Sequence, residues 1–500
     1  MFEACVFGFK AYHEARLRRV ICTMIYRLRR LMSDTVSNCS SSICSSYSLK
    51  GKPRRAARAF RLQWPPFLVA ACLTPGLALA GLCDGFVTHN KPVLVPKVNK
   101  PPHLRLYREP AFGSSVRRIT DTQPGEVFKP VYSTVQAWNA DESRMVLYRS
   151  GGSRDPGHFL LDGHSYKVIR ELDIFPSDLE DVFWSHSDPD TLFYSSKAAR
   201  DHGRLYSVNV ESGSKKLVKD FADVCGGELT LAGGDVQMQS LSDDLFGFRC
   251  YDASSTEKHY FAVTYRISTG ETHRMRMGPG TDWESWSAPN ATASGDSVYL
   301  QGNTLTVDMK SVIHTLDMGK VGEHGNIGRT WNGQDALFQV TFDPAPKGCD
   351  GDADKGVGHL TEYNLDTGKC RTIISESGGY PYTTSATHIS AQAYKKPGWV
   401  AISSVGYPKQ LKFLEGKEKA TPLFNEIYLV NTDPSNTEVC RLAHHRSTGK
   451  LSQNGSYDGY FGEPHITISP SGTRLLYGSD WYDSGSVDSY VIELPDYKRP

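Results

Sequence analysis

The segment SPSGTRLLY, residues 469–477, combines a Ser-Pro-Ser-Gly turn with an apolar strand. A turn followed by a strand of this kind is typical of a β-hairpin. The same plan occurs six more times, in NADESRMVLY (139–148), SDPDTLFY (187–194), LSDDLFGF (241–248), ASGDSVYL (293–300), WNGQDALFQV (331–340) and KKPGWVAIS (395–403). Each copy is followed by further alternating strands, as in LTEYNLDTGKCRTI (360–373). The chain is therefore expected to contain seven copies of one β unit.

Seven units of about four strands predict an all-β fold, a seven-bladed β-propeller. A β-sandwich would not explain a sevenfold recurrence. The last unit ends with its third strand, DSYVIEL (488–494), so it needs a fourth strand from elsewhere. SSVRRITD (114–121) is expected to be the outermost strand of that blade, which would remove an open sheet edge. We place the propeller at residues 114–497, after a linker at 81–113.

Residues 1–80 differ from the rest of the chain. They begin with a basic region and end in the apolar run WPPFLVAACLTPGLALAG (64–81), which contains an Ala-Leu-Ala site at 78–80. These features predict a signal peptide and a secreted or periplasmic protein with no membrane domain after cleavage. A membrane anchor is the alternative, but the run is short for a span. A lipoprotein processed at Cys72 and a true start at Met32 also remain open.

Composition limits the partners and the redox state. The 56 basic and 55 acidic residues give a net charge of +1, so the overall charge of the protein does not favour binding to nucleic acid. Six of the eleven cysteines follow residue 80, and export would allow them to form disulfides. Cys225 with Cys250 and Cys349 with Cys370 are close enough in sequence to pair, although spacing does not determine connectivity. We expect a monomer.

The innermost strand of each blade precedes the turn-strand segment and lines the central channel. Many of these strands carry polar or aromatic residues, namely Gln136, Trp138, Glu180, Trp184, Gln237, Gln239, Trp283, Glu284, Trp286, His324, Asn326, Arg329, His388, Gln392, Glu463 and His465. Propeller channels are commonly polar, so any single residue of this set is more often structural. Three histidines on successive blades, His324, His388 and His465, nevertheless indicate a site. Glu463 and His465 are two residues apart and would face the same side of a strand.

Three blades resemble those of oligogalacturonate lyases. EPHITISPSGTRLLYGSDW (463–481) is similar to the blade in which that family has a His-Pro-His motif before the final hairpin. THISAQAYKKPGWVAIS (387–403) resembles its Trp-His-x-Ser-Ser blade, and HGNIGRTWNGQDALFQV (324–340) its His-Glu-x-Trp blade. The three blades occur in the family's order and cover about 150 of the 500 residues. Elsewhere the likeness is that of one propeller to another, TolB-type propellers included.

The resemblance implies a reaction and a metal. The family cleaves uronate chains by β-elimination with a divalent ion, often manganese, held by three histidines and a glutamine. His388 and His465 then correspond to metal ligands, and His324 to a catalytic histidine. Glu463 replaces the remaining ligand histidine, and Tyr460 replaces the glutamine. A His₂-Glu set still suits Mn²⁺ or Ca²⁺, so these departures leave open either a different metal or none.

Elimination from a uronate requires a neutralised carboxylate, a base and an acid. A metal, Arg329 or a protonated histidine would provide the first, and His324 and Tyr460 are the candidates for proton transfer. His444, His445 and Arg446 are expected to overhang the channel mouth and bind the substrate. Trp184 and Trp286 are expected to stack on sugar rings. The predicted substrate is an acidic polysaccharide or oligosaccharide.

Two other function classes are compatible with the sequence. The first is a non-catalytic TolB-like propeller that binds a protein or a glycan, which would not need histidines on three neighbouring channel strands. The second is a glycoside hydrolase that uses an acidic pair among Glu180, Glu284 and Glu463. The positions of the three histidines relative to one another distinguish the lyase from the binding propeller.

Overall fold

The computed structural model describes residues 81–500 except 154, 197–202, 226–238, 252–258, 280–287, 319–324, 344–348, 350–356, 385–386, 406–418 and 449–458. The predicted N-terminal extension and signal peptide, residues 1–80, lie outside the described residues. The propeller belongs to one compact unit, residues 77–500. In the described part of the chain, no helix has the length and apolar character needed to cross a membrane.

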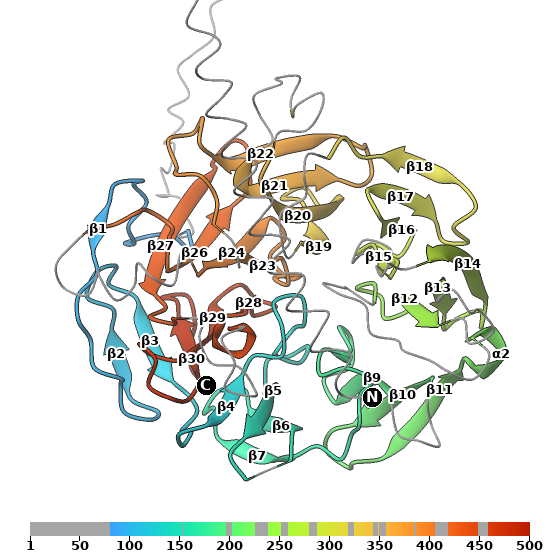
Figure 1. Ribbon diagram of the computed structural model, residues 1–500, viewed down its shortest axis with the longest axis horizontal. Helices are drawn as coiled ribbons and strands as arrows, with labels where there is room; N and C mark the ends of the chain where they lie inside the picture. The colour runs from blue at the N-terminus through green and yellow to red at the C-terminus, as the bar shows by residue number, and fades with distance from the viewer. Residues whose placement is uncertain are drawn as a thin grey trace, which may run out of the picture. The chain divides into compact units, whose positions relative to one another are not determined.

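Seven antiparallel sheets follow one another around a centre (Figure 1), so the predicted seven-bladed propeller is confirmed. From the channel outward, blade 1 contains β4 (Glu126–Lys129), β5 (Arg144–Gly151), β6 (Gly157–Asp162) and β7 (Val168–Glu171). Blade 2 contains β8 (Val182–Trp184), β9 (Thr191–Ser196), β10 (Arg204–Asn209) and β11 (Lys215–Asp220), followed by α2 (Ala222–Cys225). Blade 3 contains β12 (Leu245–Tyr251), β13 (His259–Arg266) and β14 (Thr272–Pro279), and the Gln239–Phe246 bridge lies on its inner side.

The next three blades repeat this order. Blade 4 contains β15 (Asn290–Ala291), β16 (Ser297–Leu300), β17 (Asn303–Thr306) and β18 (Val312–Thr315). Blade 5 contains β19 (Asn326–Arg329), β20 (Asp335–Thr341), β21 (Gly358–Asn364) and β22 (Cys370–Ser375). Blade 6 contains β23 (Thr387–Ser390), β24 (Trp399–Ser404), β26 (Glu426–Asn431) and β27 (Glu438–His444).

Blade 7 joins both ends of the propeller in one sheet. Its strands, from the channel outward, are β28 (Thr467–Ile468), β29 (Arg474–Ser479), β30 (Asp488–Glu493), β3 (Ser115–Arg118) and β2 (Leu106–Arg108). The predicted N-terminal strand therefore closes the last blade, since β3 pairs antiparallel with β30. It is the fourth strand and not the outermost one, because β2 adds a fifth strand beside it.

The hairpin at residues 469–477 illustrates how the repeat forms. Gly472 has a φ of 76° and its amide donates to the carbonyl of Ser469 at 2.8 Å, as a tight turn requires. The strand that follows, β29, pairs with β28 and β30 on its two sides. Its side chains are buried throughout, so neighbouring blades cover both of its faces. The apolar side chains of a blade are therefore buried by packing against the neighbouring blades.

The segment at 81–113, expected to be a linker, is attached to blades 6 and 7. Cys83 forms a disulfide with Cys440 of β27, with a Cα–Cα distance of 5.3 Å. β1 (Val93–Leu94) pairs with β25 (Lys419–Ala420), a strand in the connection between β24 and β26. Arg441 donates hydrogen bonds to the carbonyls of His89 and Lys91 at 3.1 and 2.7 Å. The propeller surface is thus partly formed by residues that precede its first blade.

Removing the Cys83–Cys440 disulfide is expected to loosen this segment without opening the ring. We expect the Cys83→Ser/Cys440→Ser variant to lose about 2–4 kcal/mol of unfolding free energy, because the cross-link restricts the unfolded chain. Amide hydrogen exchange at β1 should increase. The Cys349→Ser/Cys370→Ser variant is the matched control, since it removes a disulfide elsewhere. Equal exchange at β1 in the wild type and the Cys83→Ser/Cys440→Ser variant would contradict the expectation.

The predicted pairing of Cys349 with Cys370 is confirmed, with a Cα–Cα distance of 5.1 Å. Cys250 is also disulfide-bonded. The side chain of Cys225, its predicted partner, lies outside the described residues, so that pairing stays a prediction.

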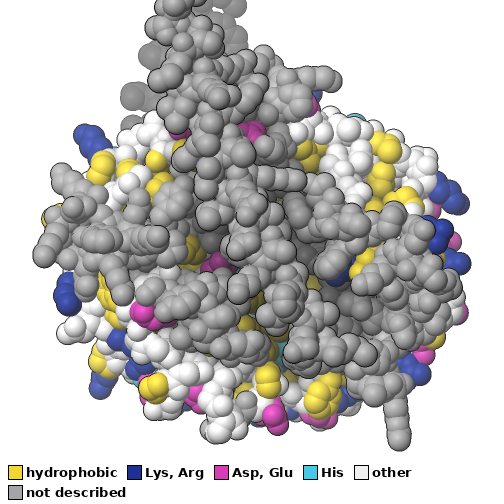
Figure 2. All heavy atoms as spheres, in the orientation of Figure 1, with side chains coloured by type: hydrophobic (Ala, Val, Ile, Leu, Met, Phe, Trp, Pro, Cys, Tyr) yellow, Lys and Arg dark blue, Asp and Glu magenta, His cyan; other side chains and the backbone are white. Residues whose placement is uncertain are grey.

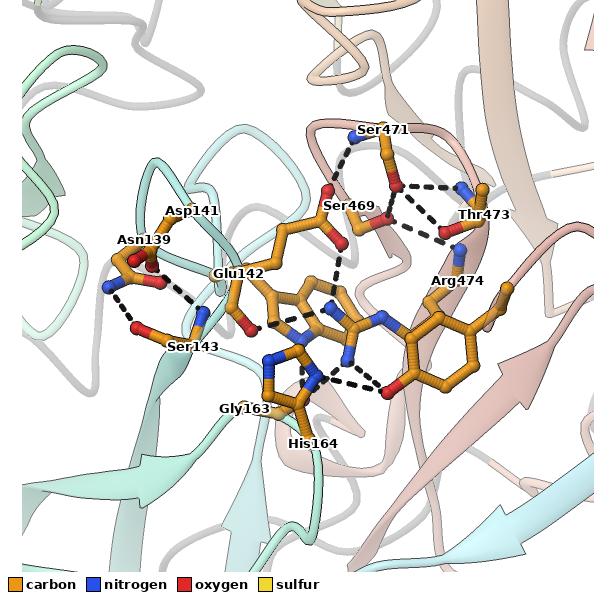
Figure 3. Close-up of polar contacts among 12 residues, drawn as sticks. Asn139, Asp141, Glu142, Ser143, Gly163, His164, Ser469, Ser471, Thr473 and Arg474 are labelled. Atoms are coloured by element: carbon orange, nitrogen blue, oxygen red, sulfur yellow. Dashed lines mark hydrogen bonds and ion pairs between the residues drawn. The ribbon is translucent and has the colours of Figure 1, made fainter. Parts of the chain in front are cut away.

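Hydrogen bonds at the inner turns join successive blades. The carboxylate of Asp243 in blade 3 accepts hydrogen bonds from the amide of His186 at 2.9 Å and the hydroxyl of Ser185 at 2.7 Å, both of blade 2. Where blade 7 meets blade 1, Glu142 accepts from the amide of Ser471 at 2.6 Å and from Arg474 at 2.7 Å (Figure 3). These contacts hold the inner strands, and hence the channel, in a fixed arrangement.

Candidate functional site

Three side chains from blades 6 and 7 converge in the channel. Oε2 of Glu463 lies 3.6 Å from Nε2 of His388 and 3.6 Å from Nε2 of His465. One donor atom from each residue falls within 4.8 Å of the others. Both imidazoles are buried, whereas the Glu463 side chain is 19% exposed. The structure therefore brings together the three residues that were predicted as metal ligands, with the carboxylate on the solvent side.

Local backbone structure positions these residues. His388 lies on the inner strand β23, which is tied to β28 by a hydrogen bond from the Ile468 amide to the Ser390 hydroxyl, at 3.2 Å. The sequence had suggested that Glu463 and His465 lie on a regular strand, and this prediction is wrong. They lie on irregular backbone between the 3₁₀-helix η2 (Tyr460–Gly462) and β28. His465 has a φ of 44°, an uncommon left-handed conformation that often marks functional sites.

The donor set fits a divalent cation. Donor atoms about 2.1 Å from a tetrahedral ion lie roughly 3.4 Å from one another. The 3.6 Å separations between Glu463 and the two histidines would have to shorten by a few tenths of an ångström, and the two histidine nitrogens, which lie within 4.8 Å of each other, would also have to move closer together. Two imidazole nitrogens and one carboxylate oxygen suit Mn²⁺ or Zn²⁺ better than Ca²⁺, which prefers oxygen ligands. The residues present could therefore hold a metal ion with positions left for water or substrate.

Two tyrosines flank the histidines. The Tyr132 ring centroid lies 5.0 Å from that of His465 and 5.4 Å from that of His388, and the Tyr460 centroid lies 4.7 Å from that of His465. The Tyr460 hydroxyl donates a hydrogen bond to the carboxylate of Glu180. Burial, together with the negative charge of Glu180, raises the pKa of Tyr460 well above its usual value. Tyr460 therefore keeps its proton near neutral pH and can act as a donor.

A buried lysine completes the surroundings of the site. Lys129 ends the inner strand β4, and its Nζ lies 5.0 Å from the ring centroid of Tyr460 and 5.6 Å from that of Phe461. Burial lowers the pKa of Lys129 to about 7, while the charges of Glu180 and Glu463 act in the opposite direction. The histidines, tyrosines and this amine form one contiguous group of titratable side chains at the channel.

Sequence reasoning missed Lys129 and Tyr132. Both occur in EVFKPVYSTVQAW (126–138), where Lys129 ends the inner strand β4 and Tyr132 follows that strand. A lysine directly after the Val-Phe pair of an inner strand is a usable signal, because lysine is almost never fully buried without a partner or a function. Glu180 was identified as a channel residue. Its hydrogen bond with Tyr460 joins residues 280 positions apart, so the local sequence does not predict it.

Other predicted channel residues line a space farther along the axis. Gln136, Trp184, Gln239 and Gln392 surround a narrow space together with Thr134, Phe183 and His186. Trp184 is buried and its indole donates to the carbonyl of Ala137 at 3.0 Å, so it joins blade 2 to blade 1. Amide groups fill much of this part of the channel, and Gln136 donates to the carbonyls of Gln392 and Ile468.

Arg329 is placed away from the three converging side chains. It ends β19, whose first residue, Asn326, accepts a hydrogen bond from the amide of Ala391 at 2.6 Å. The carbonyl of Arg329 accepts from Gly398, in the turn that leads into β24. Arg329 therefore lies beyond Ala391, at the opposite end of the inner strands from His388.

His444, His445 and Arg446 do not overhang the channel mouth. Arg446 is buried and pairs with Glu109 at 2.6 and 2.9 Å, and the ring of His444 packs on Phe112. His445 contacts the carbonyl of Ser404 at 3.0 Å, and burial lowers its pKa to about 3. The segment after β2 covers this loop, so these buried residues hold the N-terminal segment in place instead of facing solvent.

Several predicted site residues lie outside the described residues. They are Gln237, Trp283, Glu284, Trp286 and His324. On the face shown in Figure 2, the basic and acidic side chains of the described residues are interspersed, which agrees with the near-zero net charge.

No known family model matches the chain, and no curated protein sequence is significantly similar to it. Solved structures do match. An oligogalacturonate lyase in complex with manganese is 15% identical, with a TM-score of 0.54, and the match covers 82% of this chain and 98% of the lyase. An oligogalacturonate lyase from Vibrio parahaemolyticus is 14% identical, with a TM-score of 0.52, and the match covers 79% of this chain and 97% of the lyase.

The protein is therefore a seven-bladed β-propeller with two histidines and a glutamate converging in its channel. Its fold is that of the oligogalacturonate lyases, as the sequence resemblance predicted. At 14–15% identity the likeness concerns the fold alone.

Proposed function

We propose that the protein is a metal-dependent lyase that cleaves a uronate-containing glycan by β-elimination. The observation that carries the proposal is the convergence of His388, Glu463 and His465, whose donor atoms lie within 4.8 Å of one another. A fold shared with oligogalacturonate lyases, one of them bound to manganese, supports the same reaction class. A binding propeller would not need this donor set in its channel.

The proposed reaction removes the proton from C5 of the uronate and breaks the C4–O bond. The electrons of the C5–H bond form a C4=C5 double bond, and the leaving glycosidic oxygen takes up a proton. A bound divalent ion would neutralise the uronate carboxylate and so make the C5 proton more acidic. His388, Glu463 and His465 would hold that ion. Tyr460, which retains its proton beside Glu180, is proposed to protonate the leaving oxygen. His324 remains the proposed base.

The substrate is proposed to be an acidic polysaccharide or oligosaccharide. We further propose that the protein acts as a monomer after export, in keeping with disulfides that form in oxidising compartments.

Absorbance of the unsaturated uronate product tests the proposal. The protein loaded with Mn²⁺ is incubated with pectic, alginate, ulvan-like and glucuronate-bearing glycans, and the ultraviolet band of the double bond is followed. We expect absorbance to rise with one class of uronate glycan and not after chelation of the metal. Binding of a glycan or protein without any unsaturated product would instead support the non-catalytic propeller.

A further inference from the structure

Lys129 is fully buried beside the proposed metal site. Its Nζ donates a hydrogen bond to the carbonyl of Val131 at 3.2 Å and lies over the rings of Tyr460 and Phe461. Removing a lysine ammonium from water is costly, so such a residue is rarely kept for packing alone. Lys129 therefore calls for an explanation that packing does not give.

The charges around Lys129 connect it to the metal site. Glu180 and Glu463 both stabilise its ammonium electrostatically, against the effect of burial. Glu180 accepts the hydrogen bond of Tyr460, whose ring packs on His465. Glu463 is itself the carboxylate that approaches His388 and His465 at 3.6 Å. The buried ammonium is therefore separated from the three-residue donor set by the ring of Tyr460, which lies under Nζ of Lys129 and packs on His465.

We propose that the ammonium of Lys129 repels a divalent cation held by His388, Glu463 and His465 and so weakens its binding. The inference rests on the proposed metal site. Two positive charges separated by little more than the Tyr460 ring repel each other, and repulsion is strong where water is excluded. Lys129 sets the affinity so that the ion is held less tightly than the three donors alone would allow.

The test is a Mn²⁺ titration of the wild type and Lys129→Met, followed by the electron paramagnetic resonance signal of free Mn²⁺. At about pH 6, where the wild-type ammonium is charged, we expect Lys129→Met to bind Mn²⁺ at least about 10-fold more tightly. Structural damage would weaken binding, so the expected change has the opposite sign from a packing defect. Lys129→Gln, which retains a donor for the Val131 carbonyl, should shift the affinity in the same direction.

Lys395→Met is the matched control. Lys395 follows β23, and its Nζ donates to the carbonyl of Ala140 near the inner turns, at the other end of the channel strands. Its replacement removes the same charge far from the donor set and should leave Mn²⁺ affinity unchanged. If the wild type binds Mn²⁺ and neither Lys129 variant binds it more tightly, the inference is overturned while the metal site stands. If none of the variants binds Mn²⁺, the metal site itself is rejected, and the inference with it.

Discussion

Replacing His388 with alanine is expected to abolish Mn²⁺ binding while the propeller stays folded. The variant keeps only Glu463 and His465 of the three converging donors. Loss of groups that merely orient metal ligands already costs 10–100-fold in affinity, so loss of a ligand should cost at least about 100-fold. Elimination activity should fall with metal occupancy. Isothermal titration with Mn²⁺ and the absorbance of unsaturated uronate measure the two effects.

His186→Ala is the matched control for this variant. His186 is another channel histidine, but its Nδ1 pairs with Asp243 at 2.9 Å, near the inner turns of blades 2 and 3. Its replacement should lower thermal stability and leave Mn²⁺ affinity unchanged, because it contributes no donor to the site. Wild-type Mn²⁺ affinity in His388→Ala, or equal losses in the two variants, would show that the three residues do not form a metal site.

The largest effect on stability is expected from Arg474→Met. Arg474 is buried where blade 7 meets blade 1 and pairs with Glu142 at 2.7 Å (Figure 3). Its guanidinium lies 4.9 Å from the Trp138 ring centroid and also donates to the carbonyl of Gly163. Removing it leaves a largely buried carboxylate without its counter-charge, which typically costs 3–5 kcal/mol. Urea unfolding should show a loss of about that size.

Two further variants distinguish a broken ion pair from a simple loss of contacts. Glu142→Gln/Arg474→Met removes both charges and should recover part of the lost stability, because no uncompensated charge remains buried. Lys215→Met removes a more exposed ion pair with Asp173 and should change stability by less than about 1 kcal/mol. If Arg474→Met unfolds at the wild-type urea concentration, the junction between blades 7 and 1 does not depend on this pair.

The architecture could be predicted because its signals are local. Each turn-strand copy, such as SPSGTRLLY, contains its own hairpin information, and repetition reveals the blades. The incomplete last unit likewise indicated that β3 would close the ring. What the sequence could not show depends on contacts between distant positions. The Arg446–Glu109 pair spans 337 positions and the Cys83–Cys440 disulfide 357, so the buried loop at 444–446 looked like an exposed one.

The site was predictable in part for the same reason. His388 and the pair Glu463 and His465 precede the inner turns of two adjacent blades, so their approach follows from the repeat. Lys129 lies on the strand that enters blade 1, more than 250 positions earlier, and its proximity to Tyr460 follows only from ring closure. The backbone at His465 also departs from the strand that the sequence predicted. The sequence could not show this, because no residue type other than glycine clearly indicates a left-handed backbone conformation.

The arrangement of blade 7 has a consequence for how the protein is made. β30 lies between β29 and β3, so the sheet has an unfilled central position until residues 488–493 have been synthesised. Six blades can form before this strand is available, but the ring cannot close until residues 488–493 have joined blade 7. Because the donors on blades 6 and 7 meet Lys129 of blade 1 only in the closed ring, the assembled site forms after β30 has been inserted.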